Sequence, residues 1–330
     1  MRVVSRFAAS LIAALVFASA AAADAAPLQE ITIGLSSATF GTAAARVAKE
    51  MGLYERYGLE PKFVVLDNSG VATSAVISGS LTFALSGPSD MIVAQAHGQR
   101  VVVITTTYAG SAGTLVLSKK AADRLGVLPS APVAERLKAL DGLVIALTGA
   151  SGVTPVSFRS AAKAAGAAPR FTTIAQPAMP AALEHGAIDG FVASAPVWAQ
   201  PILKGTGVLW ISGPRGELPP AFIPAASGDM QTMRGTAEAN PELIKKLVAV
   251  FADFARAVEE RPDAVKAGVA KLFPDLDAAT MDLLFTSESR AWQVKPPTVA
   301  EMAHEIAFMK ASGADIPGID KIDPASMLLP

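Results

Sequence analysis

The segment that decides the fold is FALSGPSDMIVAQAHGQRVVVITT, which covers residues 83–106. Residues 83–85 predict a short apolar strand, residues 86–89 a small polar loop, and the stretch up to Gly98 a helix with apolar side chains at helical spacing. Residues 101–106 predict the next strand. Strand, small-residue loop and helix alternate in this manner from residue 31 to residue 211, which is typical of an α/β fold with largely parallel sheets.

The pattern changes near residue 240 and becomes helical. The next stretch predicts one amphipathic helix over residues 241–260, because its apolar residues recur on a single face: Leu243, Leu247, Val250, Phe251, Phe254 and Val258. Asn240 followed by Pro241 is a typical helix start, with Asn as the N-cap and Pro in the first turn. Further helices are expected around residues 262–272, 277–290 and 298–312.

The first 26 residues have the features of a secretory signal peptide. Arg2 and Arg6 precede an apolar run over residues 7–17, and small residues follow, so we expect cleavage between Ala20 and Ala26. The apolar run is shorter than the ~20 residues that span a bilayer, which disfavours a membrane anchor. We therefore expect the mature chain to be exported.

Composition narrows the class of protein further. The 330 residues carry 28 Lys and Arg against 29 Asp and Glu, and this balance argues against a nucleic-acid binder. The mean hydropathy of +0.40 reflects the leader and alanine-rich helices rather than membrane spans. Cysteine is absent, which excludes disulfides, thiolate metal sites, cysteine nucleophiles and a lipidated N-terminal cysteine. The three histidines are far apart in the sequence, and we expect neither a metal nor a cofactor.

Four motifs carry a resemblance to a known family. They are AKEMGLYERYGLE at 48–60, SGSLTFA at 78–84, AALEHGAIDG at 181–190 and SAPVW at 194–198. Over about residues 30–312 the chain resembles the substrate-binding components of ABC importers of the nitrate, sulfonate, taurine and thiamine-precursor type. It departs from the second motif at Thr82, where those proteins often have Asp.

The resemblance implies the two-lobed periplasmic-binding-protein fold of type II. Each lobe would be a mainly parallel sheet flanked by helices, and the C-terminal part would be helical. Lobe 1 would comprise residues 27–107 and 213–330, and lobe 2 residues 108–212, with chain crossings near 107–110 and 212–214 that absorb hinge rotation. The resemblance also implies a soluble periplasmic monomer that is not an enzyme. It would close on a small molecule and deliver it to an ABC permease in the inner membrane.

Ligands of open α/β sheets bind at the loops that follow the strands. These loops are rich in Gly, Ser and Thr, and several open helices, whose free N–H groups favour an anion. No Arg or Lys lies in them, so we predict a small organic anion, a sulfonate or carboxylate, held by neutral dipoles and by an apolar wall of Phe40, Tyr108 and Trp198. The predicted ligand contacts are Ser37, Thr39, Phe40, Ser69, Gly70, Ser86, Gly87, Ser89, Tyr108, Thr148, Ala150, Ser151, Gly152, Gln176, Ser194 and Trp198.

Three alternatives stay open at this point. Each loop taken alone could simply cap its own helix, with no ligand involved. A receptor of this fold could serve a membrane sensor kinase instead of an importer. Finally, enzymes that build the thiamine pyrimidine share the architecture, but they need a cysteine-containing motif that this chain lacks.

Overall fold

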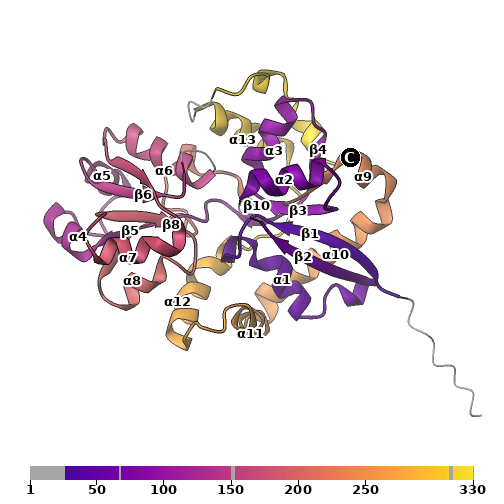
Figure 1. Ribbon diagram of the computed structural model, residues 1–330, viewed down its shortest axis with the longest axis horizontal. Helices are drawn as coiled ribbons and strands as arrows, with labels where there is room; N and C mark the ends of the chain where they lie inside the picture. The colour runs from indigo at the N-terminus through magenta and orange to yellow at the C-terminus, as the bar shows by residue number, and fades with distance from the viewer. Residues whose placement is uncertain (1–26, 67, 150–152, 312–314, 330) are drawn as a thin grey trace, which may run out of the picture.

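The computed structural model describes residues 27–66, 68–149, 153–311 and 315–329. Figure 1 shows two α/β bodies side by side, each built around a five-stranded mixed sheet. We call the sheet of β1–β4 and β10, with its helices, lobe 1, and the sheet of β5–β9, with its helices, lobe 2. The predicted two-lobed α/β fold is thereby confirmed.

The sheet of lobe 1 has one reversed strand near its middle. Strand β1 pairs in parallel with β2 and β3, whereas β10 is antiparallel to both β3 and β4. The sequence pattern did not predict β10. The spatial order is β2 (Leu59–Val65), β1 (Gln29–Leu35), β3 (Phe83–Ser86), β10 (Ala226–Met233) and β4 (Val101–Ala109).

The sheet of lobe 2 is arranged in a similar way. Strand β6 is parallel to β7 and β8, and the reversed strand β5 is antiparallel to β8 and β9. Four of the five strands in each lobe therefore run in one direction, as expected of mainly parallel sheets. The spatial order is β7 (Arg170–Thr173), β6 (Val144–Leu147), β8 (Gly190–Ala193), β5 (Thr114–Ser118) and β9 (Gly207–Ser212).

Helices surround both sheets (Figure 1). Those between the strands of lobe 1 are α1 (Ala43–Glu50), α2 (Ser69–Ile77) and α3 (Pro88–Ala96). Those between the strands of lobe 2 are α4 (Lys119–Leu125), α5 (Val133–Lys138), α6 (Val153–Ala164), α7 (Met179–Glu184) and α8 (Ala199–Leu203). The C-terminal part contains α9 (Arg234–Ala239), α10 (Pro241–Glu260), α11 (Pro262–Leu272), α12 (Ala278–Glu288) and α13 (Val299–Ala311). Among the described residues, no helix combines the length and apolarity needed to cross a membrane.

Helix α10 has the predicted bounds but not the predicted cap. Five of the six predicted apolar residues, including Leu247 and Phe251, are buried in the core that α10 shares with α1 and α11, and Val258 is half-buried. The Asn240 side chain does not bond to the first turn; its Nδ2 donates instead to the carbonyl oxygen of Thr236 at 2.9 Å. The Asn240 side chain thus bonds to the end of the preceding helix α9 and not to the start of α10, where the sequence predicted its cap.

Two chain segments connect the lobes, residues 110–113 and residues 213–225, and they lie against each other. The Gly213 N–H donates to the Gly113 carbonyl at 2.8 Å. A Cβ on Gly213 would collide with the carbonyl oxygens of Gly113 and Ser111, so glycine permits this close approach. Ser227 on β10 holds the first segment, because its Oγ donates to the Gly110 carbonyl at 2.6 Å and accepts from the Ala112 N–H at 3.1 Å.

A buried contact also joins the lobes behind the connecting segments. The Glu288 carboxylate on α12 accepts a 2.5 Å hydrogen bond from Tyr108 Oη of lobe 1 and a 3.2 Å bond from Trp198 Nε1 of lobe 2. Nearby, the Phe40 N–H donates to the Ala195 carbonyl at 3.2 Å. The largest core cluster consequently contains residues from both lobes.

Candidate ligand-binding site

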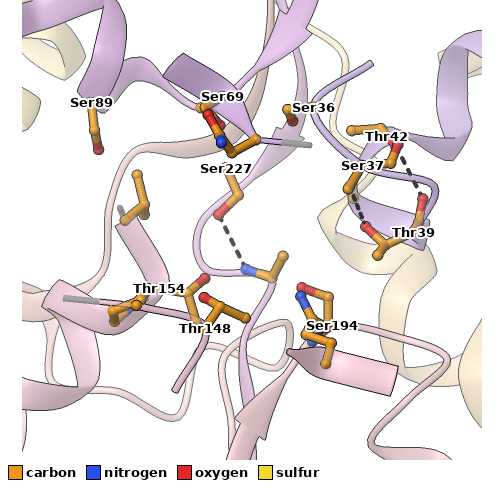
Figure 2. Close-up of a pocket in the computed structure, with 18 of the residues that line it drawn as sticks. Ser36, Ser37, Thr39, Thr42, Ser69, Ser89, Thr148, Thr154, Ser194 and Ser227 are labelled. Atoms are coloured by element: carbon orange, nitrogen blue, oxygen red, sulfur yellow. Dashed lines mark hydrogen bonds between the residues drawn. The ribbon is translucent and has the colours of Figure 1, made fainter. Parts of the chain in front are cut away.

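A cavity of about 560 Å³ lies between the two lobes. Figure 2 shows hydroxyl side chains of both lobes facing it, with Ser69 and Ser89 on one side and Thr148 and Thr154 on the other. The described residues that line it are Ser36, Ser37, Thr39, Gly41, Thr42, Asn68, Ser69, Gly70, Gly87, Ser89, Asp90, Ala112, Thr148, Gly149, Val153, Thr154, Pro155, Gln176, Val192, Ala193, Ser194 and Ser227.

The lobe 1 side of the cavity is built from three strand-to-helix junctions. Ser36 and Ser37 follow β1, residues 68–70 follow β2 and open α2, and residues 87–90 follow β3 and open α3. Asn68 caps α2, since its Oδ1 accepts from the Val71 N–H at 3.0 Å. These junctions lie together because β1, β2 and β3 are parallel, so their carboxyl ends share one edge of the sheet.

Lobe 2 supplies the opposite wall in the same way. Residues 148–149 follow β6, Gln176 follows β7 and Ser194 follows β8, while residues 153–155 form the first turn of α6. Gln176 Oε1 accepts from the Ser194 N–H at 2.9 Å, which fixes these two loops relative to each other. The first turn of a 12-residue helix therefore faces the cavity with its positive dipole end.

Some of the hydroxyl groups are used within the protein and others are not. Ser37 Oγ and Thr39 Oγ1 lie 2.9 Å apart, and Thr42 Oγ1 donates to the Ser37 carbonyl at 2.7 Å. Ser89 is 5% exposed, and its Oγ has no hydrogen-bond partner in the described structure. A buried hydroxyl without a partner carries a desolvation cost that a ligand group can relieve.

Asp90 is the one charged side chain among the described lining residues. It is the third residue of α3 and half-buried, and burial raises the pKa of its carboxyl above the ordinary value. No Arg, Lys or His of the described lining faces it. The described lining is thus polar, and Asp90 is its single acidic side chain, on the lobe 1 side.

The structure brings nine of the sequence-predicted residues together on the cavity wall. They are Ser37, Thr39, Ser69, Gly70, Gly87, Ser89, Thr148, Gln176 and Ser194. Three more predictions, Ala150, Ser151 and Gly152, lie outside the described residues. Ser86 ends β3, is fully buried and does not line the cavity.

The three aromatic residues expected as an apolar wall lie elsewhere. Phe40 stacks on Phe273 and Trp292, with ring centroids 5.0 and 5.9 Å away, and all of its surface is buried. Tyr108 and Trp198 are also fully buried and bond to Glu288 in the contact between the lobes. The wall prediction is corrected accordingly: no aromatic side chain belongs to the described lining.

Sequence reasoning missed several lining residues, notably Asp90, Thr154 and Ser227. Asp90 and Thr154 belong to the first turns of α3 and α6, just beyond the loops that were singled out. Extending each loop by one helical turn would have included both. Ser227 lies on β10, whose existence the sequence did not suggest.

The described residues contain no group of three or more His, Asp or Glu side chains arranged to hold a metal ion. What the described lining offers is hydrogen bonding: hydroxyl groups, backbone N–H groups at helix starts, the amides of Asn68 and Gln176, and the Asp90 carboxylate. This inventory suits a small polar molecule enclosed between the two walls.

Comparisons with known proteins agree with this architecture. The family model described as the NMT1-like family matches residues 24–273. No protein of curated function matches the chain by sequence.

Several solved structures share the fold. The periplasmic aliphatic sulphonate-binding protein of Escherichia coli superposes with a TM-score of 0.69 at 17% identity, covering 91% of this chain and 98% of its own. The alkanesulfonate-binding protein of Xanthomonas axonopodis pv. citri, bound to MOPS, gives 0.69 at 17% identity, covering 92% and 99%. The periplasmic nitrate-binding protein of Synechocystis PCC 6803 gives 0.60 at 14% identity, covering 89% and 86%.

Proposed function

The chain belongs to the NMT1-like family, and on that premise we propose that it is the periplasmic solute-binding receptor of an ABC importer. It captures a small organic anion between its lobes, a sulfonate or a carboxylate, and passes it to a permease in the inner membrane. The sulfonate- and nitrate-binding proteins among its structural neighbours support this class of ligand. The signal peptide expected at residues 1–26 supports export.

The observation that carries the proposal is the cavity itself. Its two walls come from different sheets, and each is made of the loops that follow parallel strands. A ligand held by both walls stabilises the arrangement in which the walls are close, which couples binding to closure. We place the hinge in the connecting segments 110–113 and 213–225, where glycines adjoin and Ser227 links strand to segment.

A binding role without catalysis is part of the proposal. The described lining offers a single titratable side chain, Asp90, and acid–base catalysis generally needs a positioned proton donor and acceptor around the reacting atoms. The protein is proposed to act as a monomer whose closed form is read by the permease. A sensor kinase as recipient remains the alternative, and uptake of the bound ligand by cells with and without the receptor gene distinguishes the two.

The test is isothermal titration of the purified mature protein with a panel of sulfonates and carboxylates, preceded by mass spectrometry of any ligand retained in purification. At Gly149 a Cβ would have no described atom within 4 Å, so Gly149→Leu should project into the cavity and abolish binding without unfolding the protein. Gly235→Leu on α9 is the matched control, because that position is equally open but lies far from the cavity lining. Binding that survives Gly149→Leu would overturn the cavity as the binding site. Binding confined to uncharged and cationic compounds would overturn the proposed ligand class.

A further inference from the structure

We propose that Asp90 selects ligands that carry a protonated amine, so that the ligand is amphoteric, with its nitrogen against lobe 1 and its acidic head against lobe 2. This inference rests on the proposed receptor function and narrows its ligand class. It makes Asp90 a specificity-determining residue of the cavity.

The charge distribution of the wall is the first argument. A receptor for a simple anion gains nothing from a carboxylate in its cavity, because like charges a few ångströms apart repel. Asp90 is nevertheless the one charged group of the described lining, which contains no basic side chain. A ligand with a positively charged group would form the ion pair with Asp90 that no side chain of the described lining forms.

The fold does not explain Asp90. An acidic residue at the third position of a helix commonly bonds back to the N–H of the cap residue. The cap residue here is Gly87, and the Asp90 carboxylate makes neither that bond nor an ion pair with any described residue. The helix dipole favours a carboxylate in this turn, but it gives the carboxylate oxygens no hydrogen-bond partner. Asp90 therefore remains half-buried, with hydrogen-bonding capacity unused.

Acceptor oxygens converge beside Gly70. A Cβ on Gly70 would lie 3.4 Å from Asp90 Oδ1 and 3.3 Å from Asn68 Oδ1, so the two oxygens approach the same point from different elements. Asn68 Oδ1 accepts one bond from Val71 and keeps a second lone pair. Because residue 70 has no side chain, the space between these oxygens is open to the cavity.

Ser89 supplies a further acceptor on the same wall. Its Oγ is buried, unpartnered and directed toward the cavity in Figure 2. An ammonium group has three N–H donors, and this wall offers three kinds of oxygen for them: carboxylate, amide and hydroxyl. A sulfonate or carboxylate head has acceptors only and cannot use the Asp90 oxygens.

The opposite wall is suited to the acidic head. Thr148 and Thr154 present hydroxyl groups there, and the first turn of α6 presents its positive end. No carboxylate belongs to the described lobe 2 lining. The lobe 1 wall therefore favours a positively charged group and the lobe 2 wall a negatively charged one. A molecule with an ammonium group at one end and an acidic head at the other can bind both walls at once.

The experiment compares matched ligands on three proteins. The probes are 3-aminopropanesulfonate with propanesulfonate, 4-aminobutyrate with butyrate, and propylamine, each titrated calorimetrically into wild type, Asp90→Asn and Asp123→Asn. Asp123 lies on α4 and pairs with Lys119 on the surface, so Asp123→Asn makes the same chemical change away from the cavity. Circular dichroism and thermal melting establish that all three proteins are folded.

We expect wild type and Asp123→Asn to bind the amine-bearing acids 10- to 100-fold more tightly than their amine-free partners, the range of one charge-assisted hydrogen bond. Asp90→Asn should lose that preference by weakening the amine-bearing acids alone. Equal affinities within the pairs, tighter binding of the amine-free acids, or a preference unchanged in Asp90→Asn would overturn the inference and leave the receptor function standing. Binding of propylamine alone would support the role of Asp90 and overturn the anionic ligand class. Failure of every probe to bind at millimolar concentration would count against both.

Discussion

Glu288 gives the sharpest quantitative prediction, because it is a fully buried carboxyl group in the contact between the lobes. Burial raises the pKa of Glu288 from 4.5 to about 7, against the lowering influence of its bonds to Tyr108 and Trp198. Between those two values the folded protein keeps a proton that the unfolded chain has already released. The free energy of unfolding therefore falls as the pH rises through this window.

The size of the effect follows from the same two values. A difference of about 2.5 pH units at about 1.4 kcal/mol each amounts to about 3 kcal/mol of stability, present below pH 4.5 and lost by about pH 7. Glu288→Gln keeps the shape of the side chain and cannot ionise. At pH 5 the variant should be within about 1 kcal/mol of wild type, and at pH 8 it should be more stable by about 2 kcal/mol.

The assay is urea unfolding followed by tryptophan fluorescence at pH 5, 6, 7 and 8. Asp229 and Glu305 are also buried, and burial raises their pKa values to about 7 and about 8. Their ionisation therefore lowers the free energy of unfolding of wild type and variant equally as the pH rises. The relevant quantity is thus the difference between the two proteins at each pH. Exposed Glu259→Gln serves as the control and should follow wild type throughout. Parallel curves for wild type and Glu288→Gln would refute the reasoning.

Three further predictions concern packing and capping. Gly190→Ala in β8 places a Cβ 2.7 Å from the Val116 carbonyl oxygen and should cost about 1–3 kcal/mol in urea unfolding, whereas Gly235→Ala, with open space around it, should be neutral or slightly stabilising. Leu247→Ala removes a fully buried side chain of α10 and should cost about 2–5 kcal/mol, while Leu128→Ala, 70% exposed, should change the midpoint little. Ser118→Ala removes the N-cap bond to Ala121 and should cost about 1 kcal/mol, recovered by Ser118→Asp; equal melting of all three proteins would contradict this.

The elements that the sequence predicted well are those with a strong local pattern. Helix α10 was expected at its observed bounds, because its buried face repeats at helical spacing. Strand β10 was missed because its sequence, ASGDMQTM, has no alternation and few apolar residues. It is a strand because β3 and β4 pair with it on both sides, which is tertiary information.

In the cavity, too, some features could be predicted from the sequence and others depend on tertiary structure. Its loops were predictable, since loops that follow parallel strands converge whatever their sequence. The direction of a side chain was not, as Phe40 and Trp198 illustrate: both adjoin cavity loops in the sequence, yet both point into the core. Asp90 was not predicted as a lining residue, because an acidic residue in the first turn of a helix is usually explained by its interaction with the helix dipole.

The position of β10 has a consequence for how the chain folds as it is synthesised. Among the described strands, β4 pairs with β10 alone, and β10 comes from residues 226–233, after the strands of lobe 2. Strands β5–β9, by contrast, form one uninterrupted run over residues 114–212. Lobe 2 can thus complete its sheet while lobe 1 still lacks the strand that joins its halves. The lobe whose strands are synthesised first therefore cannot complete its sheet until residues 226–233 have been added.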